Sequence, residues 1–243
     1  MLQSDDTLSQ DPIAENHRLQ PLEAFLGSLG AKVYQTLRQA ILSLSYRPGE
    51  ILRKPEICAE LGVSRSPVSD AVARLAVEGL VDVVPQAGTY VARFSMAEIR
   101  EGAFLREAIE LQAIEMVAGN ISDEQLVTLR RNITVQAALL ADGDFPGFYQ
   151  LDGEMHELIR SFTGYRKLSA VAETAWVHVE RARRLVLPVD GRVAATLEEH
   201  RAILAALEAR DPLAARAAMR AHLRKLVTYL EPLERSHPEL FNP

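Results

Sequence analysis

The chain has 243 residues, of which 48% are hydrophobic and 25% charged, and its 27 Lys and Arg against 33 Asp and Glu give a net charge of −6. At roughly 100–200 residues per domain, this length forms one large domain or two smaller ones. The single cysteine, Cys58, excludes a disulfide framework. The chain has neither a signal-peptide pattern nor an apolar run near the roughly 18 residues that span a bilayer, so we expect a cytoplasmic protein without a membrane partner.

The distribution of residue types favours helices and sets one segment apart. Aromatic residues make up 6% of the chain, and Ala and Leu are abundant in its second half, a balance typical of packed helices. Residues 31–94 carry eight basic and six acidic side chains, a net charge of +2, so the rest of the chain carries −8. We therefore expect a mostly α protein in which residues 31–94 are the part suited to nucleic acid.

The apolar pattern of residues 30–94 predicts a winged helix-turn-helix domain. Apolar residues first recur at helical spacing, and Gly and Pro interrupt them. Ser64 supplies an N-cap oxygen for the third helix, and two β-branched runs around a short turn predict a hairpin. The predicted segments are helices from 31 up to Pro48-Gly49, at 55–61 and from Ser64 onward, and strands at 80–84 and 89–91.

The segments on either side of this domain have different patterns. Residues 1–29 are polar and aperiodic, which predicts a mobile tail with a short helix near 22–29. Residues 95–235 show only helical patterns, beginning with a capping box at Ser95 and Glu98, and predict an antiparallel all-α bundle of six or seven helices. Residues 236–243 are expected to form a C-terminal tail.

The third helix has the two faces that a DNA-reading helix needs. Such a helix docks on its own domain with an apolar face and meets base edges in the major groove with a small or polar face. Val68, Val72 and Leu75 form the apolar face, and Arg65 lies at the amino-terminal end, where backbone amides can bind a phosphate. A small helical subdomain with solvated polar residues is the structural alternative.

The stretch Leu61-Gly62-Val63-Ser64-Arg65-Ser66-Pro67-Val68, followed by Glu78-Gly79-Leu80-Val81 and by Gly88 in the wing, resembles the DNA-binding domain of GntR-type bacterial transcription regulators. The resemblance implies binding to double-stranded operator DNA. It departs at Ser69, Lys54-Pro55 and Gln86-Ala87, where many relatives are charged, which implies weaker phosphate contacts. The residues expected to meet DNA are Arg53, Lys54, Ser64, Arg65, Ser66, Ser69, Gln86 and Gly88.

Three histidines of the predicted bundle lie in or beside apolar rows, where an imidazole needs a partner. Asp152 and His156 are four residues apart and share a helix face, while His200 and His222 each interrupt an apolar row. Convergence of these groups would create a divalent metal site, with zinc expected first and nickel, manganese or iron also compatible. Each histidine finding a separate backbone carbonyl is the alternative.

The same four residues resemble the ligand set of the FCD effector domain in the FadR-like branch of the GntR family, and the resemblance covers about residues 95–233. It implies that Arg106 lies near an effector cavity. An ion pair with Glu110 or Glu115 is the structural alternative for this arginine. Arg181, in a cluster with Arg183 and Arg184, is the second expected anion contact.

These features together predict a homodimeric transcription regulator, more often a repressor, that reads an inverted repeat. The predicted effector is a small carboxylate, such as a sugar acid, a hydroxy acid or a dicarboxylate, bound beside the metal. The alternative function is a metal-dependent hydrolase or other enzyme that uses the Asp and three His residues. No catalytic Ser-His-Asp spacing or phosphate-binding glycine pattern supports that alternative.

Overall fold

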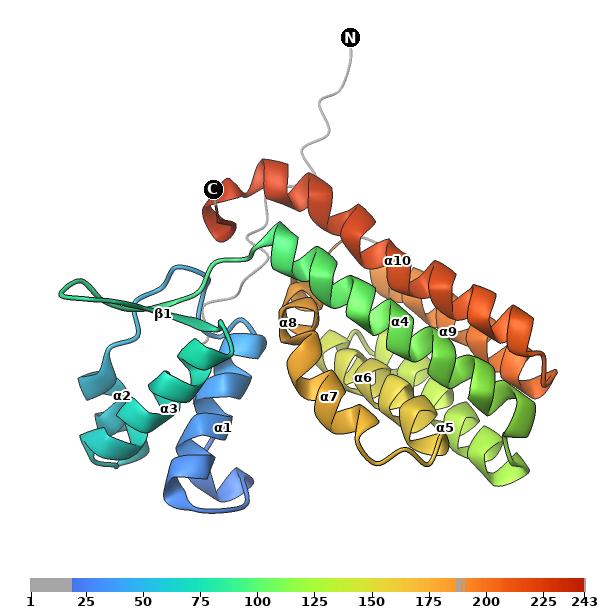
Figure 1. Cartoon of the computed structure of the whole chain (residues 1–243), viewed down its shortest axis with the longest axis horizontal. Coiled ribbons are helices and arrows are strands. Elements are labelled where there is room, and N and C mark those ends of the chain that lie inside the picture. Colours follow the sequence, from blue (N-terminus) through green and yellow to red (C-terminus); the bar gives the residue numbers. More distant parts are fainter. Residues whose placement is uncertain (1–18, 187–188, 190, 243) are drawn as a thin grey trace, which may run out of the picture. The chain divides into compact units, whose positions relative to one another are not determined.

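The computed structural model describes residues 19–186, 189 and 191–242. The chain divides into two compact units, Met1–Arg93 and Phe94–Pro243. Ten α-helices and one two-stranded sheet lie in the described residues (Figure 1). None of the helices in these ranges is long and apolar enough to cross a membrane. The mostly α fold class is confirmed.

The first unit has the three helices and the hairpin that the sequence predicts. Helix α1 packs against α3, and α2 packs against α3 as well. Val33, Leu37 and Ile41 lie on one face of α1 and are fully buried, as are Val68 and Leu75 on α3. The elements are α1 (Leu29–Leu42), α2 (Lys54–Leu61), α3 (Arg65–Val77), β1 (Val81–Val84) and β2 (Gly88–Val91).

Two turns set the start of α3 and the tip of the wing. Gly62 ends α2 with a left-handed backbone (φ 63°), a conformation that glycine adopts without strain. Ser64 is the N-cap residue of α3, as predicted. Its side-chain oxygen accepts no capping hydrogen bond, however, so that part of the prediction is wrong. In the wing, the Ala87 N–H donates to the Val84 carbonyl at 3.1 Å, and Gln86 takes a φ of 62° at the tip.

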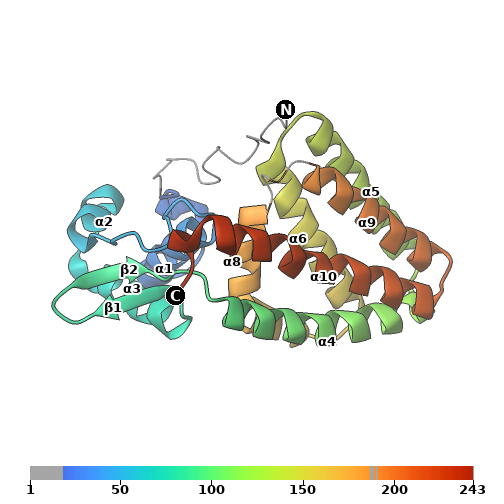
Figure 2. The same cartoon turned by 90° about the horizontal axis from the view of Figure 1, so that it is seen from above.

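The described residues of the second unit form a bundle of seven helices, within the predicted six or seven. Helices α4 and α10 run side by side (Figures 1 and 2), α5 packs on α6 and α9, and α9 packs on α10. The seven helices are α4 (Met96–Asn120), α5 (Asp123–Ala141), α6 (Phe145–Phe162), α7 (Leu168–Ala175), α8 (Val177–Val186), α9 (Arg192–Glu208) and α10 (Pro212–Ser236).

Helix caps fix where the long helices of this bundle begin. The Ser95 hydroxyl accepts a hydrogen bond from the Glu98 N–H at 3.2 Å, which is one half of the predicted capping box at α4; the return bond from the Ser95 N–H to the Glu98 side chain is not formed. Ser122 and Gln125 form a complete reciprocal capping box at α5. Asp211 accepts from two amides at the start of α10. These bonds satisfy backbone donors that have no partner inside a helix.

The described part of the predicted N-terminal tail is held in place. Residues 1–18 lie outside the described residues, whereas Leu19 is buried and its N–H donates to the Glu60 carboxylate at 3.0 Å. The Thr36 hydroxyl donates to the Gln20 carbonyl at 2.8 Å. The short helix expected near 22–29 is a single 3-10 turn, Leu22–Ala24. Residues 19–28 therefore belong to the first unit instead of the predicted tail.

The C-terminal residues also differ from the predicted tail. A 3-10 turn, Pro238–Leu240, leads into Phe241, which is buried with its ring centroid 5.6 Å from that of Phe94. The Phe94 N–H donates to the Leu240 carbonyl at 2.9 Å, and the Asn242 N–H donates to the Phe94 carbonyl at 2.7 Å. Residues 238–242 thus fix Phe94, the first residue of the second unit.

We predict that Phe241→Ala destabilises the second unit, because it removes a buried aromatic ring and leaves a cavity beside Phe94. Such substitutions cost about 3–5 kcal/mol. Urea unfolding followed by circular dichroism measures the change. The exposed Asn242→Ala variant keeps its backbone hydrogen bond and serves as the control. A Phe241→Ala protein as stable as that control would contradict the packing described for this end.

Candidate functional site

Four side chains from three helices converge inside the second unit. Asp152 and His156 lie one turn apart on α6, His200 lies on α9 and His222 on α10. All four are buried, with 0 to 6% of their surface exposed. One possible ligand atom from each lies within 4.8 Å of the others. The fold therefore brings together the four residues that the sequence predicts as one site.

The position of α6 follows from its cap and its apolar face. The Asp144 side chain accepts from the Gly147 N–H at 2.9 Å and starts the helix ahead of Pro146. Met155 and Ile159 bury one face of α6 in the main apolar core. Asp152 and His156 lie beside this face, so packing of α6 holds both side chains toward α9 and α10.

The hydrogen bonds of His200 define which ring nitrogen carries its proton. His200 Nδ1 lies 2.7 Å from Gln136 Oε1. The Gln136 amide nitrogen donates to Asn132 Oδ1 at 2.7 Å, so its carbonyl oxygen is the atom that faces His200. A carbonyl oxygen only accepts, and Nδ1 of His200 therefore carries the proton. Nε2 of the neutral ring is left with a lone pair.

The other two histidines are arranged in the same way around carboxylates. His156 Nδ1 lies 2.5 Å from Glu110 Oε2, and His222 Nδ1 lies 2.7 Å from Glu199 Oε2. A carboxylate that accepts at Nδ1 fixes the ring orientation and leaves Nε2 as a donor to a metal. All three imidazoles thus present the same nitrogen toward the centre of the cluster.

The centre of the cluster holds electron pairs without protons between them. His156 Nε2 and His222 Nε2 are 3.1 Å apart, and His200 Nε2 lies 3.2 Å from Asp152 Oδ1. Among the described residues, His200 Nε2 has no hydrogen-bond partner. Buried acceptors that face one another are unfavourable unless a cation lies between them. Three nitrogens and one carboxylate oxygen are a donor set that fits a divalent transition metal.

Burial keeps the three imidazoles in the form that binds a metal. Loss of solvation lowers the pKa of His156, and the charge of Glu110 only partly opposes this. Burial likewise holds the pKa of His200 and His222 well below the usual range. The rings are therefore neutral near pH 7, with their Nε2 lone pairs available.

The two outer carboxylates stay ionised because arginines neutralise them. Burial alone would raise the pKa of Glu110, but nearby Arg106, His156 and Arg160 hold it well below its usual range. Arg106 Nε lies 2.7 Å from Glu110 Oε1. Burial would also raise the pKa of Glu199, but hydrogen bonds from His222 and Arg192 lower it to about 2. Both carboxylates can therefore act as fixed acceptors.

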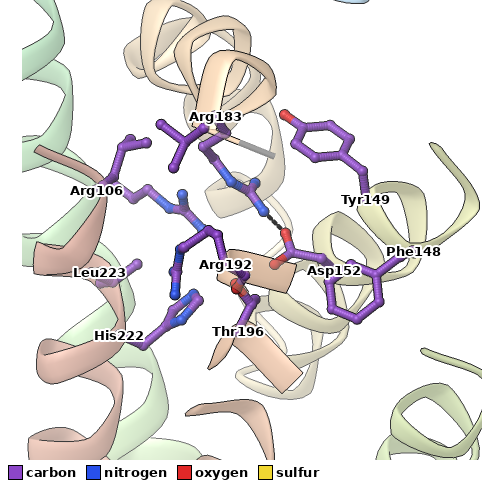
Figure 3. A pocket seen from close by; sticks show the side chains of 11 residues that line it. Arg106, Phe148, Tyr149, Asp152, Arg183, Arg192, Thr196, His222 and Leu223 are labelled. Atoms are coloured by element: carbon purple, nitrogen blue, oxygen red, sulfur yellow. Dashed lines mark hydrogen bonds and ion pairs between the residues drawn. The ribbon is translucent and has the colours of Figure 1, made fainter. Parts of the chain in front are cut away.

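A cavity of about 50 Å³ lies beside the cluster and contains Asp152 and His222 in its wall. Three guanidinium groups point into this region, those of Arg106, Arg183 and Arg192 (Figure 3). A pocket with three cations and one carboxylate in its wall attracts small anions. Its remaining wall is formed by the hydroxyl-bearing Tyr149 and Thr196 and by the apolar Phe148, Val186, Leu223 and Leu226.

The predicted effector residues have different positions. Arg106 lines the cavity and also forms an ion pair with Glu110. The position near a cavity and the alternative ion pair are therefore both present. Arg181 is fully buried, its guanidinium lies 4.5 Å from the ring centroid of Phe94, and it does not line the cavity. Arg183 lines the cavity instead. Residues two apart on a helix point to nearly opposite sides, which separates the two arginines.

Sequence reasoning missed the three Nδ1 partners, Glu110, Gln136 and Glu199, as members of the site. Glu110 was predicted only as a possible ion-pair partner of Arg106. The signal for Gln136 was weak, because it is one polar residue in an ordinary helical pattern. The structure buries it completely. His178, which has no counterpart in the predicted ligand set, does not line the cavity.

The residues predicted to meet DNA lie on the first unit with the accessibility that this role requires. Val68, Val72 and Leu75 are buried, and the opposite face of α3 is open. Arg53 is exposed and lies 3.6 Å from Glu56, a surface pair worth little energy. The exposed predicted contacts are Arg53, Ser64, Arg65, Ser66, Ser69 and Gln86, while Lys54 and Gly88 are half-buried.

Two family descriptions match the chain, one for each unit. The family described as bacterial regulatory proteins, gntR family, matches residues 29–91, and the FCD domain matches residues 101–225. The chain is 35% identical to an HTH-type transcriptional regulator in an unstable DNA locus of Streptomyces ambofaciens, over 86% of this chain and 88% of that protein. It is 29% identical to the HTH-type transcriptional repressor RspR of Escherichia coli strain K12, over 87% of this chain and 92% of that protein.

Two solved structures show the same fold. Escherichia coli McbR/YncC aligns with a TM-score of 0.74 at 20% identity, over 86% of this chain and 99% of that one. A transcriptional regulator from Rhodococcus sp. RHA1 aligns with a TM-score of 0.72 at 22% identity, over 84% and 99%. The relatives named here are regulators and not enzymes, so the hydrolase alternative is set aside. The chain belongs to the GntR family of bacterial transcription regulators and carries an FCD domain.

Proposed function

We propose that this regulator represses transcription and that a small organic acid, bound beside a divalent metal in the second unit, controls its affinity for operator DNA. The observation that carries the proposal is the set of three Nε2 atoms and one carboxylate oxygen that face one another beside a cavity with three arginines. Repressor function is supported by names of relatives. Besides RspR, a relative from Paenarthrobacter nicotinovorans, 26% identical, is named a probable D-xylose utilization operon repressor.

Asp152, His156, His200 and His222 would hold the metal, with zinc expected first and nickel, manganese and iron also compatible with the donors. The bound ion would supply positive charge and a coordination position for a carboxylate oxygen. The residues of the chain would exclude water from the site, orient the metal-binding atoms and place positively charged side chains around the effector.

The effector class follows from the cavity wall. Arg106 and Arg183 offer charged donors for a carboxylate, and Thr196 and Tyr149 add hydroxyl groups. The small volume, about 50 Å³, favours a compact acid. A hydroxy acid, a sugar acid and a dicarboxylate all remain candidates. Arg181, the other arginine expected to bind the effector, is replaced in this proposal by Arg183, because Arg181 lies under Phe94.

The second copy of the chain is proposed to bind along α4. Phe104, on this helix, has 73% of its surface exposed, and its neighbour Leu105 is also exposed. Adjacent exposed apolar side chains form the kind of surface through which proteins associate. A two-fold dimer presents two copies of α3, which matches an operator that is an inverted repeat.

DNA binding is tested at the amino-terminal end of α3. We predict that Arg65→Ala weakens binding to a duplex selected from a random pool by about 1–3 kcal/mol, because an exposed arginine at this position reads base edges or phosphates. Fluorescence anisotropy at fixed salt measures the affinity. Arg131→Ala removes an exposed arginine from the second unit and is the control. Equal affinities for wild type and Arg65→Ala would refute the assignment.

Metal content tests the second part of the proposal. We predict about one equivalent of zinc, or of another first-row metal, in protein purified without a histidine tag, and loss of that metal in His200→Ala, because His200 supplies one of four donors. Elemental analysis measures both. His178→Ala removes a histidine outside the cluster and should keep the metal. Negligible metal in both wild type and His200→Ala would end the metal hypothesis.

The oligomeric state tests the role of α4. We predict that Phe104→Glu shifts the protein from dimer to monomer, because it places a charge in a face proposed to be apolar and shared. Analytical ultracentrifugation gives the mass. Leu213→Glu changes an equally exposed leucine on α10 and should leave the dimer intact. A dimer that withstands Phe104→Glu but dissociates with Leu213→Glu would place the interface elsewhere.

A further inference from the structure

Arg183 lies between the two parts of the proposed site. Its side chain is mostly buried and lines the cavity that also contains Arg106 and Arg192 (Figure 3). Its Nη2 atom makes an ion pair with Asp152 Oδ2, drawn as the dashed line in Figure 3. One guanidinium group is thus in contact with a proposed metal ligand and with the space proposed for the effector.

The two oxygens of Asp152 have separate partners. Oδ1 lies 3.2 Å from His200 Nε2, at the centre of the four-residue cluster. Oδ2 makes the ion pair with Arg183. The arginine therefore holds the carboxylate in an orientation that keeps Oδ1 directed at the position of a cation. Neither contact has to break for the other to form.

Neighbouring groups fix the position and the charge of Arg183. Its Nη1 lies 2.9 Å from Glu180 Oε2, and its guanidinium carbon lies 4.9 Å from the ring centroid of Tyr149. The Tyr149 hydroxyl also donates to the Glu180 carboxylate, at 2.6 Å. Burial lowers the pKa of Arg183 to about 10, so the side chain is still a cation near pH 7.

Arg106 and Arg192 contact the cluster only indirectly, through a glutamate. Arg106 contacts Glu110, which contacts His156. Arg192 contacts Glu199 through two hydrogen bonds, and Glu199 contacts His222. In both cases a carboxylate and an imidazole separate the arginine from the position of a cation. Arg183 touches a ligand group directly, so a change in its partners alters that ligand with no intermediate.

We propose that Arg183 is a positioning residue that couples anion binding in the cavity to metal binding at Asp152. This inference rests on the proposed function. An anion that accepts a hydrogen bond from Arg183 takes up part of its positive charge, which leaves Asp152 a stronger electron donor to a metal. Each ligand then raises the affinity for the other by the same factor, as linkage requires.

The test measures zinc affinity of the full-length chain by competition with a chromophoric chelator, in acetate and in chloride of equal ionic strength. Acetate serves as the anion probe because it combines a carboxylate with a methyl group suited to the apolar part of the cavity wall. The variants are Arg183→Gln, Arg183→Lys and the control Arg184→Gln. Arg184 is on the same helix and lies over the ring of Tyr149, but it does not line the cavity.

We expect acetate to raise the zinc affinity of wild type and Arg184→Gln by at least about fivefold, the lower end of ordinary coupling. The same comparison should give less than about twofold for Arg183→Gln. Arg183→Lys keeps the charge but loses the planar fork that can contact two carboxylates at once, and should behave like Arg183→Gln.

Three results would overturn the inference while leaving the metal site intact. They are an acetate effect that survives in Arg183→Gln, full rescue by Arg183→Lys, and zinc-binding wild type with no response to acetate. A wild-type chain that binds none of zinc, nickel, manganese and iron would overturn the metal part of the proposed function and this coupling together. Metal binding by wild type in chloride therefore separates failure of the proposed metal site from failure of the coupling alone.

Discussion

The structure of the second unit depends on one arrangement: three neutral imidazoles and one carboxylate that face one another in a buried space. Glu110, Gln136 and Glu199 accept at the Nδ1 atoms and direct every Nε2 inward. Five helices contribute these residues, so their packing and the cluster depend on each other. Electron pairs in contact without a proton between them are costly, and a divalent cation placed between them would remove that cost.

The cavity and the start of the second unit are connected by one helix. On α8, Arg183 faces the cavity, while Arg181 faces Phe94. Phe94 follows directly after the first unit and is held by the C-terminal residues through backbone hydrogen bonds and the ring of Phe241. A movement of α8 on ligand binding would therefore act on the residue where the second unit begins. The two arginines thus place α8 in contact with both the cavity and Phe94.

The sequence predicted the elements from local spacing, and it predicted the four central residues from the spacing of Asp152 and His156, from the apolar rows that His200 and His222 interrupt, and from the resemblance to a family ligand set. Periodic apolar residues gave the helices of each unit, and the four-residue step from Asp152 to His156 gave the paired ligands. The Nδ1 partners were missed because they belong to other helices, and helix pairing is not encoded in spacing. Which of Arg181 and Arg183 faces the cavity depends on how α8 is rotated about its own axis, and spacing along the chain does not determine that rotation. Leu19 and Phe241 lie in short segments without a repeating apolar pattern, so no periodicity indicated their burial.

Operator affinity measured with metal-loaded and chelator-stripped protein, each with and without a panel of small carboxylates, tests whether metal and acid together control DNA binding. We predict that at least one acid changes the affinity of the metal-loaded protein by about 5–150-fold, the range of ordinary coupling energies. The same acid should have little effect on the stripped protein. Operator affinity that is unchanged by metal and by every acid would contradict the account.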